Sequence, residues 1–204
     1  MTPRAPRRDA ADNRAALVSA AQRALRDDPD AGLDVITAEA GLTRRALYGH
    51  FGGRDDLVRA VVVAGAERIS ATVAQAGHPD PLTAVALIAD RLWAEIDGVR
   101  TIAALAVRSP LVDDAAAALA PVRAALRAAV TAGVAAERIR TDIPAETLAR
   151  LLESTAVAVL QHAASTGLAS DEARELVLRS TLSVAGLGWR DADELAARVI
   201  AEAR

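Results

Sequence analysis

The sequence predicts an all-α protein, on the evidence of its composition, its breaks and one short motif. Aromatic residues make up only 2% of the 204 residues, while hydrophobic residues, mostly alanine and aliphatic ones, make up 52%. Glycine and proline fall mainly between runs in which apolar residues recur at helical spacing. In the motif, residues 38–51, two short helical patterns flank a turn in which Gly41 can adopt a positive φ and Thr43 can cap the next helix. We therefore expect about nine or ten helices and no strands.

A three-helix domain with a helix-turn-helix motif is expected over residues 12–58. The first helix, residues 12–26, has a stripe of apolar side chains that can support the motif. Residues 33–40 and 43–51 then form the two helices of the motif itself, the second of which is the recognition helix. The arginine-rich segment before them, residues 1–11, has little to bury, so we expect it to be a disordered basic arm.

A fourth helix, from Arg54 to about Gln75, is expected to join this domain to a C-terminal helical bundle. We assign residues 59–204 to a ligand-binding and dimerisation domain. Its first helix has a clear start, because Asp80 can serve as the N-cap and Pro81 as the first helical residue. The remaining helices are expected at 82–97, 99–107, 111–136, 145–166, 171–187 and 191–203, the third of these with a break at Pro121.

The charges permit a nucleic-acid partner without demanding one. The formal net charge is −3, but through Arg68 the chain has 11 arginines against 10 acidic residues, and all its basic residues are arginine. There is no cysteine, so disulfides and thiolate metal sites are excluded. No window reaches the roughly 18 apolar residues of a membrane span, and the N-terminus lacks the apolar core of a signal peptide. We expect a soluble cytoplasmic protein with no membrane association.

The exposed side of the recognition helix carries side chains suited to binding DNA. Arg44 and Arg45 lie in its first turn, which enters the major groove, where arginine can bind O6 and N7 of guanine with two hydrogen bonds. Tyr48 and His50 can donate hydrogen bonds to phosphate oxygens. The alternative is that these are ordinary solvated charges and that Tyr48 is partly core. We assign DNA contacts to Thr43, Arg44, Arg45, Tyr48, Gly49, His50 and Arg54.

The same segment resembles the N-terminal domain of TetR-family transcriptional regulators. A weaker resemblance, over residues 138–152, is to the join between the seventh and eighth helices of that family. The chain departs from the family pattern at Gly32, where threonine is usual, at Asp34, whose carboxylate repels DNA, and at Gly49, which brings no side chain to the groove. The matching positions are Ile36, Ala40, Gly41, Leu42, Thr43, Leu47, Tyr48, His50, Phe51, Arg54 and Leu57.

The resemblance implies a homodimeric regulator, most often a repressor, that binds a palindromic DNA operator and is released by a small-molecule effector. It also implies an effector pocket in the C-terminal bundle and a dimer interface made largely by the last two long helices. The many alanine and leucine side chains favour a mostly apolar effector. Candidate pocket residues are Trp93, Arg100, Thr155, Gln161 and His162, of which Trp93 and His162 also suit plain core positions. Candidate interface residues are Ala156, Leu160, Ala163, Ser180, Thr181 and Val184.

The sequence does not suggest an enzyme, a cofactor or a metal site. Its three histidines are scattered, and no nucleophile, phosphate-binding or dinucleotide-binding motif is present. An alternative to the DNA-binding regulator stays open because of Asp34 and Gly49. This alternative is a degenerate or protein-contacting helical dimer that does not bind specific DNA.

Overall fold

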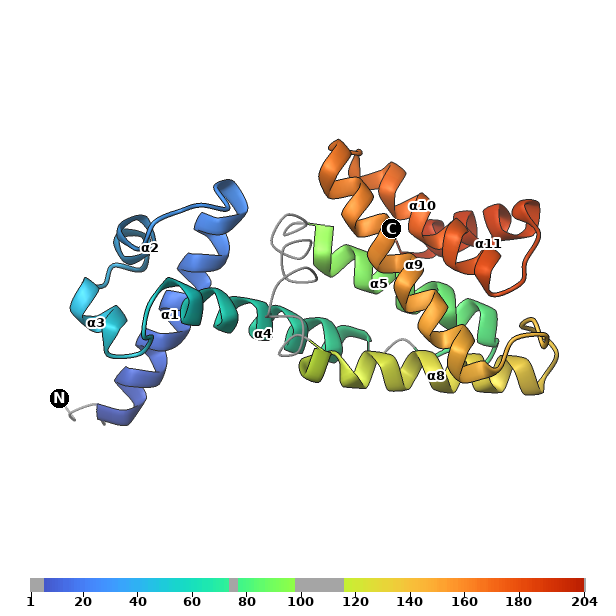
Figure 1. Cartoon of the computed structure of the whole chain (residues 1–204), viewed down its shortest axis with the longest axis horizontal. Coiled ribbons are helices and arrows are strands. Elements are labelled where there is room, and N and C mark those ends of the chain that lie inside the picture. The colour runs from blue at the N-terminus through green and yellow to red at the C-terminus, as the bar shows by residue number, and fades with distance from the viewer. Residues whose placement is uncertain (1–5, 74–76, 98–115, 204) are drawn as a thin grey trace. The chain divides into compact units, whose positions relative to one another are not determined.

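The computed structural model describes residues 6–73, 77–97 and 116–203 of the chain, with the side chains of residues 6–9 excluded (Figure 1). Every regular element in these ranges is a helix, which confirms the predicted all-α class. The chain divides into two compact units, Met1–Gly65 and Ala66–Arg204. The boundary lies inside one continuous helix, α4 (Arg54–Val73). It falls seven residues after residue 58, where the sequence predicts the end of the first domain.

The N-terminal unit is built from α1 (Pro6–Asp27), α2 (Leu33–Ala40), α3 (Arg44–Tyr48) and the first part of α4 (Arg54–Val73). Helix α1 packs against both α2 and α3. It begins six residues before the expected start and therefore includes half of the segment predicted to be a disordered arm. Proline is favoured in the first turn of a helix, and the alanines and arginines that follow it are good helix formers. The core of this unit is made by Leu17, Leu25, Ile36, Leu47, Phe51 and Leu57.

The turn of the motif has the geometry that its sequence predicts. Gly41 ends α2 with φ 65° and ψ 26°, a left-handed conformation that favours glycine. The N–H of Ala46 donates to the hydroxyl oxygen of Thr43 at 3.2 Å, so Thr43 is the N-cap of α3. Helix α3 ends at Tyr48 and not at Phe51, because the N–H of His50 donates to the carbonyl oxygen of Leu47, three residues earlier, and the N–H of Gly52 donates to the carboxylate of Asp56.

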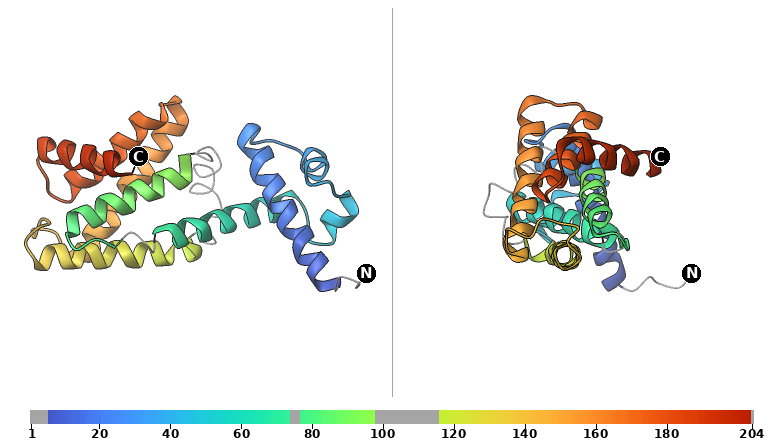
Figure 2. Two further views of the ribbon diagram at one scale, coloured as in Figure 1. Left: turned by 180° about the vertical axis from the view of Figure 1, so that it is seen from behind. Right: turned by 90° about the vertical axis from the view of Figure 1, so that its right-hand side faces the viewer.

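The C-terminal unit is a helical bundle made of α5 (Pro81–Asp97), α8 (Ala120–Ala135), α9 (Ala145–Thr166), α10 (Ser170–Val184) and α11 (Trp189–Glu202), together with the end of α4. Helix α10 packs against α5, α9 and α11, while α8 packs against α5 and α9. In Figures 1 and 2, α5 (green) lies between α8 (yellow) and the pair α10 and α11 (orange to red). The largest fully buried side chains of this core include Leu148, Leu152, Leu178, Leu182 and Val199.

Two helix starts in this unit follow from local chemistry. The carboxylate of Asp80 accepts hydrogen bonds from the N–H of Thr83 at 3.0 Å and from its hydroxyl at 2.8 Å, which confirms the predicted N-cap of α5. Helix α8 begins at Ala120, because Pro121 lies in the first turn, where its missing N–H leaves no helical bond unmade. The expected helices at 99–107 and the first part of 111–136 fall outside the described residues.

One ion pair lies inside the bundle and ties α5 to α10. The guanidinium of Arg174 donates to both carboxylate oxygens of Asp90, at 2.6 and 2.9 Å. Asp90 is buried, with 4% of its surface exposed. A buried carboxylate is tolerated only when it is paired and hydrogen-bonded in this way.

Within the described residues, we find no helix with the length and apolar character of a membrane span.

Candidate nucleic-acid interface

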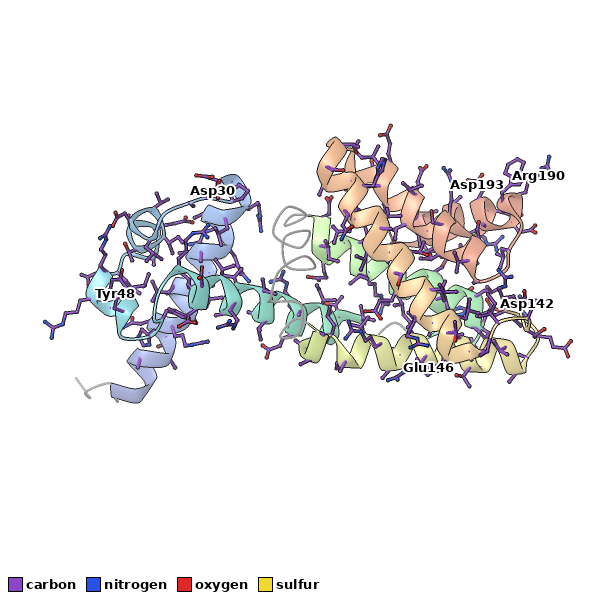
Figure 3. The ribbon with its side chains drawn as sticks, viewed as in Figure 1. Asp30, Tyr48, Asp142, Glu146, Arg190 and Asp193 are labelled. Carbon is purple, nitrogen blue, oxygen red and sulfur yellow. The ribbon has the colours of Figure 1, made fainter. Side chains whose placement is uncertain are left out.

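The short helix α3 has one face in the core and one in solvent. Leu47 is fully buried and anchors the helix against the rest of the unit, with Phe51 beside it. Arg44, Arg45 and Tyr48 are exposed, and 57% of the surface of Tyr48 is accessible to solvent. Tyr48 is labelled in Figure 3. An exposed aromatic residue between basic side chains, on a helix this short, adds little to folding. The arrangement leaves these side chains available for contact with a partner.

Arg44 forms an ion pair with Asp34, which lies in the first turn of α2. Its Nε donates to one carboxylate oxygen of Asp34 and its Nη2 to the other. The hydrogen bonds from Arg44 hold the pKa of the Asp34 carboxyl below its usual value, and the same pair raises the pKa of Arg44. The sequence indicates a carboxylate at Asp34 that repels DNA, but it does not reveal this partner, because the two residues lie ten positions apart across the turn.

Arg54, which the sequence assigns to a phosphate contact, is bound to the protein itself. Its Nη2 donates to the carbonyl oxygen of Pro29 at 2.7 Å and its Nε to that of Ala31 at 3.4 Å. Two donors of the guanidinium therefore fix the loop between α1 and α2, the loop that carries Asp30 in Figure 3. A phosphate contact from the rest of the guanidinium stays a prediction.

The remaining predicted contact residues lie around the ends of α3. Thr43 is exposed at the N-terminus, and His50 is half-buried just beyond the C-terminus. Gly49 has φ −72° and ψ −17°, a conformation open to any residue, so its backbone does not require glycine. A Cβ there would lie 3.3 Å from the carbonyl oxygen of Ala46, which leaves little room for a side chain.

Arg14 of α1 is an exposed basic residue near the end of α3 that the sequence does not single out. It is exposed, and its guanidinium carbon lies 5.2 Å from the centre of the Phe51 ring, close enough for a cation–π contact. Its spacing within α1 gives no sign of this position, since only the packing of α1 across α3 brings it there.

Comparison with known families identifies the region that contains this surface. Residues 17–61 match the sequence model of the bacterial regulatory proteins of the tetR family. Over these residues the chain has the sequence pattern of the TetR-family N-terminal domain. TetR-family members are DNA-binding transcriptional regulators, which gives the exposed basic face of α3 its context. A comparison with curated proteins finds no significant match.

Solved structures of transcriptional regulators share the fold of nearly the whole chain. A TetR transcription regulator from Haloarcula marismortui is 21% identical with a TM-score of 0.70, over 92% of this chain and 98% of that one. LfrR from Mycobacterium smegmatis in complex with proflavine is 21% identical with a TM-score of 0.60, over 87% and 97%. FadR from Bacillus subtilis in complex with stearoyl-CoA is 14% identical with a TM-score of 0.64, over 85% and 98%.

The predicted effector residues do not converge on one described site. Trp93 is buried in the bundle core, whereas His162 is exposed on α9. Thr155 and Gln161 are half-buried, and the hydroxyl of Thr155 donates to the carbonyl oxygen of Leu151 at 2.8 Å. Arg100 lies outside the described residues. Among those that are described, no group of three His, Asp or Glu side chains can hold a metal ion.

The predicted dimer residues separate into two groups. Leu160, Ala163 and Thr181 are buried in the core of a single chain, with 4%, 1% and 3% of their surfaces exposed. They offer no surface to a second copy, so the interface expectation is corrected for these three. Leu160 and Ala163 lie on an apolar face of α9 that packs inside the bundle. Ala156, Ser180 and Val184 are half-buried and retain accessible surface.

The outer face of α9 carries a stripe that the sequence analysis did not single out. Residues 154–170 contain no acidic residue and no arginine. Within this run Ser154, Ala158, His162 and Ser165 are exposed, and Leu151 precedes them on the same face with 42% of its surface exposed. The uncharged run is visible in the sequence, but the packing of α9 decides which of its side chains reach the surface.

Proposed function

We propose that the protein is a transcriptional repressor that binds a palindromic operator as a homodimer and releases it when a small-molecule effector binds. The observation that carries the proposal is α3, a recognition helix of a TetR-family domain whose inner face is anchored by Leu47 and whose outer face presents Arg44 and Arg45. This helix supports a function in which side chains at its N-terminus read bases in the major groove.

The roles of the surrounding residues follow from their chemistry. Arg44 and Arg45 donate to guanine, while Tyr48, His50 and the hydroxyl of Thr43 donate to phosphate oxygens. Gly49 lets the backbone at the end of α3 approach the DNA closely, and Arg54 adds a phosphate contact from its remaining donors. Arg14, near the end of α3, is a further phosphate ligand on this proposal.

The homodimer is expected to form through the exposed faces of α9 and α10. Their accessible small and uncharged side chains let two helices approach closely without burying charge. Ala156, Ser180 and Val184 belong to this surface, together with the exposed stripe of α9. Because a two-fold dimer presents two copies of α3, it reads two half-sites about one helical turn apart, and the operator is a palindrome.

The effector is expected to be a mostly apolar organic molecule. Proteins of the same fold bind proflavine and stearoyl-CoA. The core of the bundle in this chain consists largely of alanine, leucine and valine side chains. Trp93, Arg100, Thr155, Gln161 and His162 are its candidate contacts. A coupling of about 1–3 kcal/mol between the two sites reduces DNA affinity by roughly 5- to 150-fold. A repressor of this kind acts in the cytoplasm and has no catalytic activity.

A second candidate is a helical dimer that no longer binds specific DNA, and it is favoured by one observation. The carboxylate of Asp34 lies beside Arg44 on the surface that faces DNA, where it repels phosphates. On this view, the pairing of Arg44 with Asp34 has removed a cation from the interface.

Selection from a random duplex library at physiological salt separates the two candidates. The purified full-length protein is incubated with the library, bound duplexes are sequenced, and the oligomeric state is measured in the same preparation. Enrichment of a palindrome is the expected result. A folded dimer that enriches no sequence contradicts the regulator and favours the second candidate.

A further inference from the structure

The ion pair between Asp34 and Arg44 joins the two helices of the motif at the surface proposed to meet DNA. Asp34 lies in the first turn of α2, and Arg44 is the first residue of α3. The two side chains are 69% and 61% exposed, so solvent and a bound DNA can both reach them. The pair therefore lies within the candidate interface and not behind it.

Asp34 binds one edge of the Arg44 guanidinium and leaves another edge available for a DNA base. An arginine has five N–H donors in one plane. Asp34 takes one donor on Nε and one on Nη2, the side edge of the group. Both donors on Nη1 and the second donor on Nη2 stay available. One donor of Nη1 and the one of Nη2 form the outer edge, while the other Nη1 donor points back toward Cδ. Two parallel bonds to O6 and N7 of guanine need only one such edge.

The pair also limits how Arg44 moves before DNA binds. A free exposed arginine samples many rotamers and loses that freedom when it contacts a base. Two parallel hydrogen bonds to a carboxylate fix both the position and the plane of the guanidinium. The same carboxylate repels phosphates wherever the domain lies on DNA, whatever the base sequence.

We propose that Asp34 is a positioning residue that sets sequence specificity: it holds the guanidinium of Arg44 for guanine and weakens the sequence-independent attraction to phosphates. This inference rests on the proposed function, because it needs a domain that binds DNA. It predicts that a change at Asp34 moves the non-specific affinity and the preference for the operator in opposite directions. Removing the charge of Asp34 strengthens non-specific binding while weakening the preference for the operator.

The test compares the wild type with Asp34→Asn on the selected operator and on a duplex of scrambled sequence, by fluorescence anisotropy at several salt concentrations. We expect the ratio of operator affinity to scrambled affinity to fall by about two- to fivefold, the range of an exposed ion pair. The affinity for the scrambled duplex should rise, most strongly at low salt.

Asp27→Asn is the matched control, because it makes the same change of charge in the same unit. Asp27 is exposed in the last turn of α1 and lies outside the motif. Its replacement should leave the affinity ratio unchanged. In an Arg44→Ala background, Asp34→Asn should no longer change the ratio, because no guanidinium is left to position.

A measurement without DNA makes the outcomes distinguishable. The Nε–H of Arg44 should exchange slowly with solvent in the nuclear magnetic resonance spectrum of the wild type and exchange quickly in Asp34→Asn. A wild type that prefers an operator, with an unchanged ratio in Asp34→Asn, overturns this inference and leaves the proposed function intact. A wild type without any sequence preference overturns the proposed function and this inference together, even if the slow exchange of Nε–H is seen.

Discussion

Each unit of the chain has an ion pair between two helices, and the two pairs differ in burial. In the N-terminal unit the arginines of α3 are exposed, and even the ion pair of Arg44 lies in solvent. In the C-terminal unit Arg174 is turned inward and pairs with the buried carboxylate of Asp90. Water screens the first pair strongly and the second weakly. The first pair therefore leaves its arginine accessible to a partner, whereas the second stabilises the core of its unit.

The largest effect is expected from the buried pair. Arg174→Ala leaves the carboxylate of Asp90 buried without its main partner, which should lower the free energy of unfolding of the C-terminal unit by about 3 kcal/mol or more. Chemical denaturation followed by circular dichroism measures this change. The double variant Asp90→Leu, Arg174→Leu should recover most of the loss, since it removes both charges. A loss of unfolding free energy below about 1 kcal/mol in the single variant would show that water reaches the pair and screens it as it screens a surface pair.

A cavity created under α3 by substitution tests whether the two units lose stability independently of each other. Leu47→Ala should destabilise the N-terminal unit by about 2–5 kcal/mol, because Leu47 is fully buried. Hydrogen exchange resolved by residue should show faster exchange in α2 and α3 and unchanged exchange in α9 and α10. Ala46→Gly, a change on the same helix outside the core, serves as the comparison for lost helix propensity, at about 1 kcal/mol. Equal acceleration in both units would contradict the division.

Replacing the exposed residues of α3 should alter DNA recognition and leave folding unchanged. Arg44→Ala and Arg45→Ala should each relax the base preference by about 1–3 kcal/mol at one position of the half-site. Tyr48→Phe should weaken binding to all sequences alike, by about 1 kcal/mol, because it removes a single phosphate contact. Selection from a random library with each variant gives the preferences directly. Unchanged selectivity in both arginine variants would refute the assignment of base reading to them.

The smallest effect concerns the cap of α5. Desolvation raises the pKa of Asp80, but hydrogen bonds from Thr83 and Arg138 outweigh it and hold the pKa below its usual value. Because the folded pKa is lowered, Asp80 stabilises the fold above its unfolded pKa of about 3.9, and this contribution is lost as the pH falls through the folded value. Asp80→Asn should therefore be less stable at pH 7 by under about 1 kcal/mol. The difference from the wild type should shrink on acidification, and a difference that grows instead would exclude this cap as its source.

The features that could be predicted from the sequence are those whose hydrogen bonds close within a few residues. The left-handed Gly41, the Thr43 cap three residues before Ala46 and the Asp80 cap three residues before Thr83 are all of this kind. These features depend on local chemistry alone, because the donor and the acceptor are brought together as soon as the helix itself forms. The recognition helix and its exposed arginines follow from the same local pattern.

The features that escaped prediction depend on residues brought together by packing. Arg54 binds the loop between α1 and α2, and Arg174 pairs with Asp90 across 84 positions of sequence. Leu160 and Ala163 resemble interface residues in the sequence, since a helix with two apolar faces does not reveal which face its own chain covers. Their burial in the bundle is decided only when α8 and α10 pack against α9.

The sequence by itself determined the helical class, the motif, its caps and the side chains that α3 presents, because helical periodicity and capping are properties of neighbouring residues. The tertiary structure alone decided which apolar faces are core, which arginines are bound by the protein, and that Asp34 meets Arg44. These outcomes depend on the direction in which each helix leaves its turn, and that direction is set by long-range burial of apolar surface.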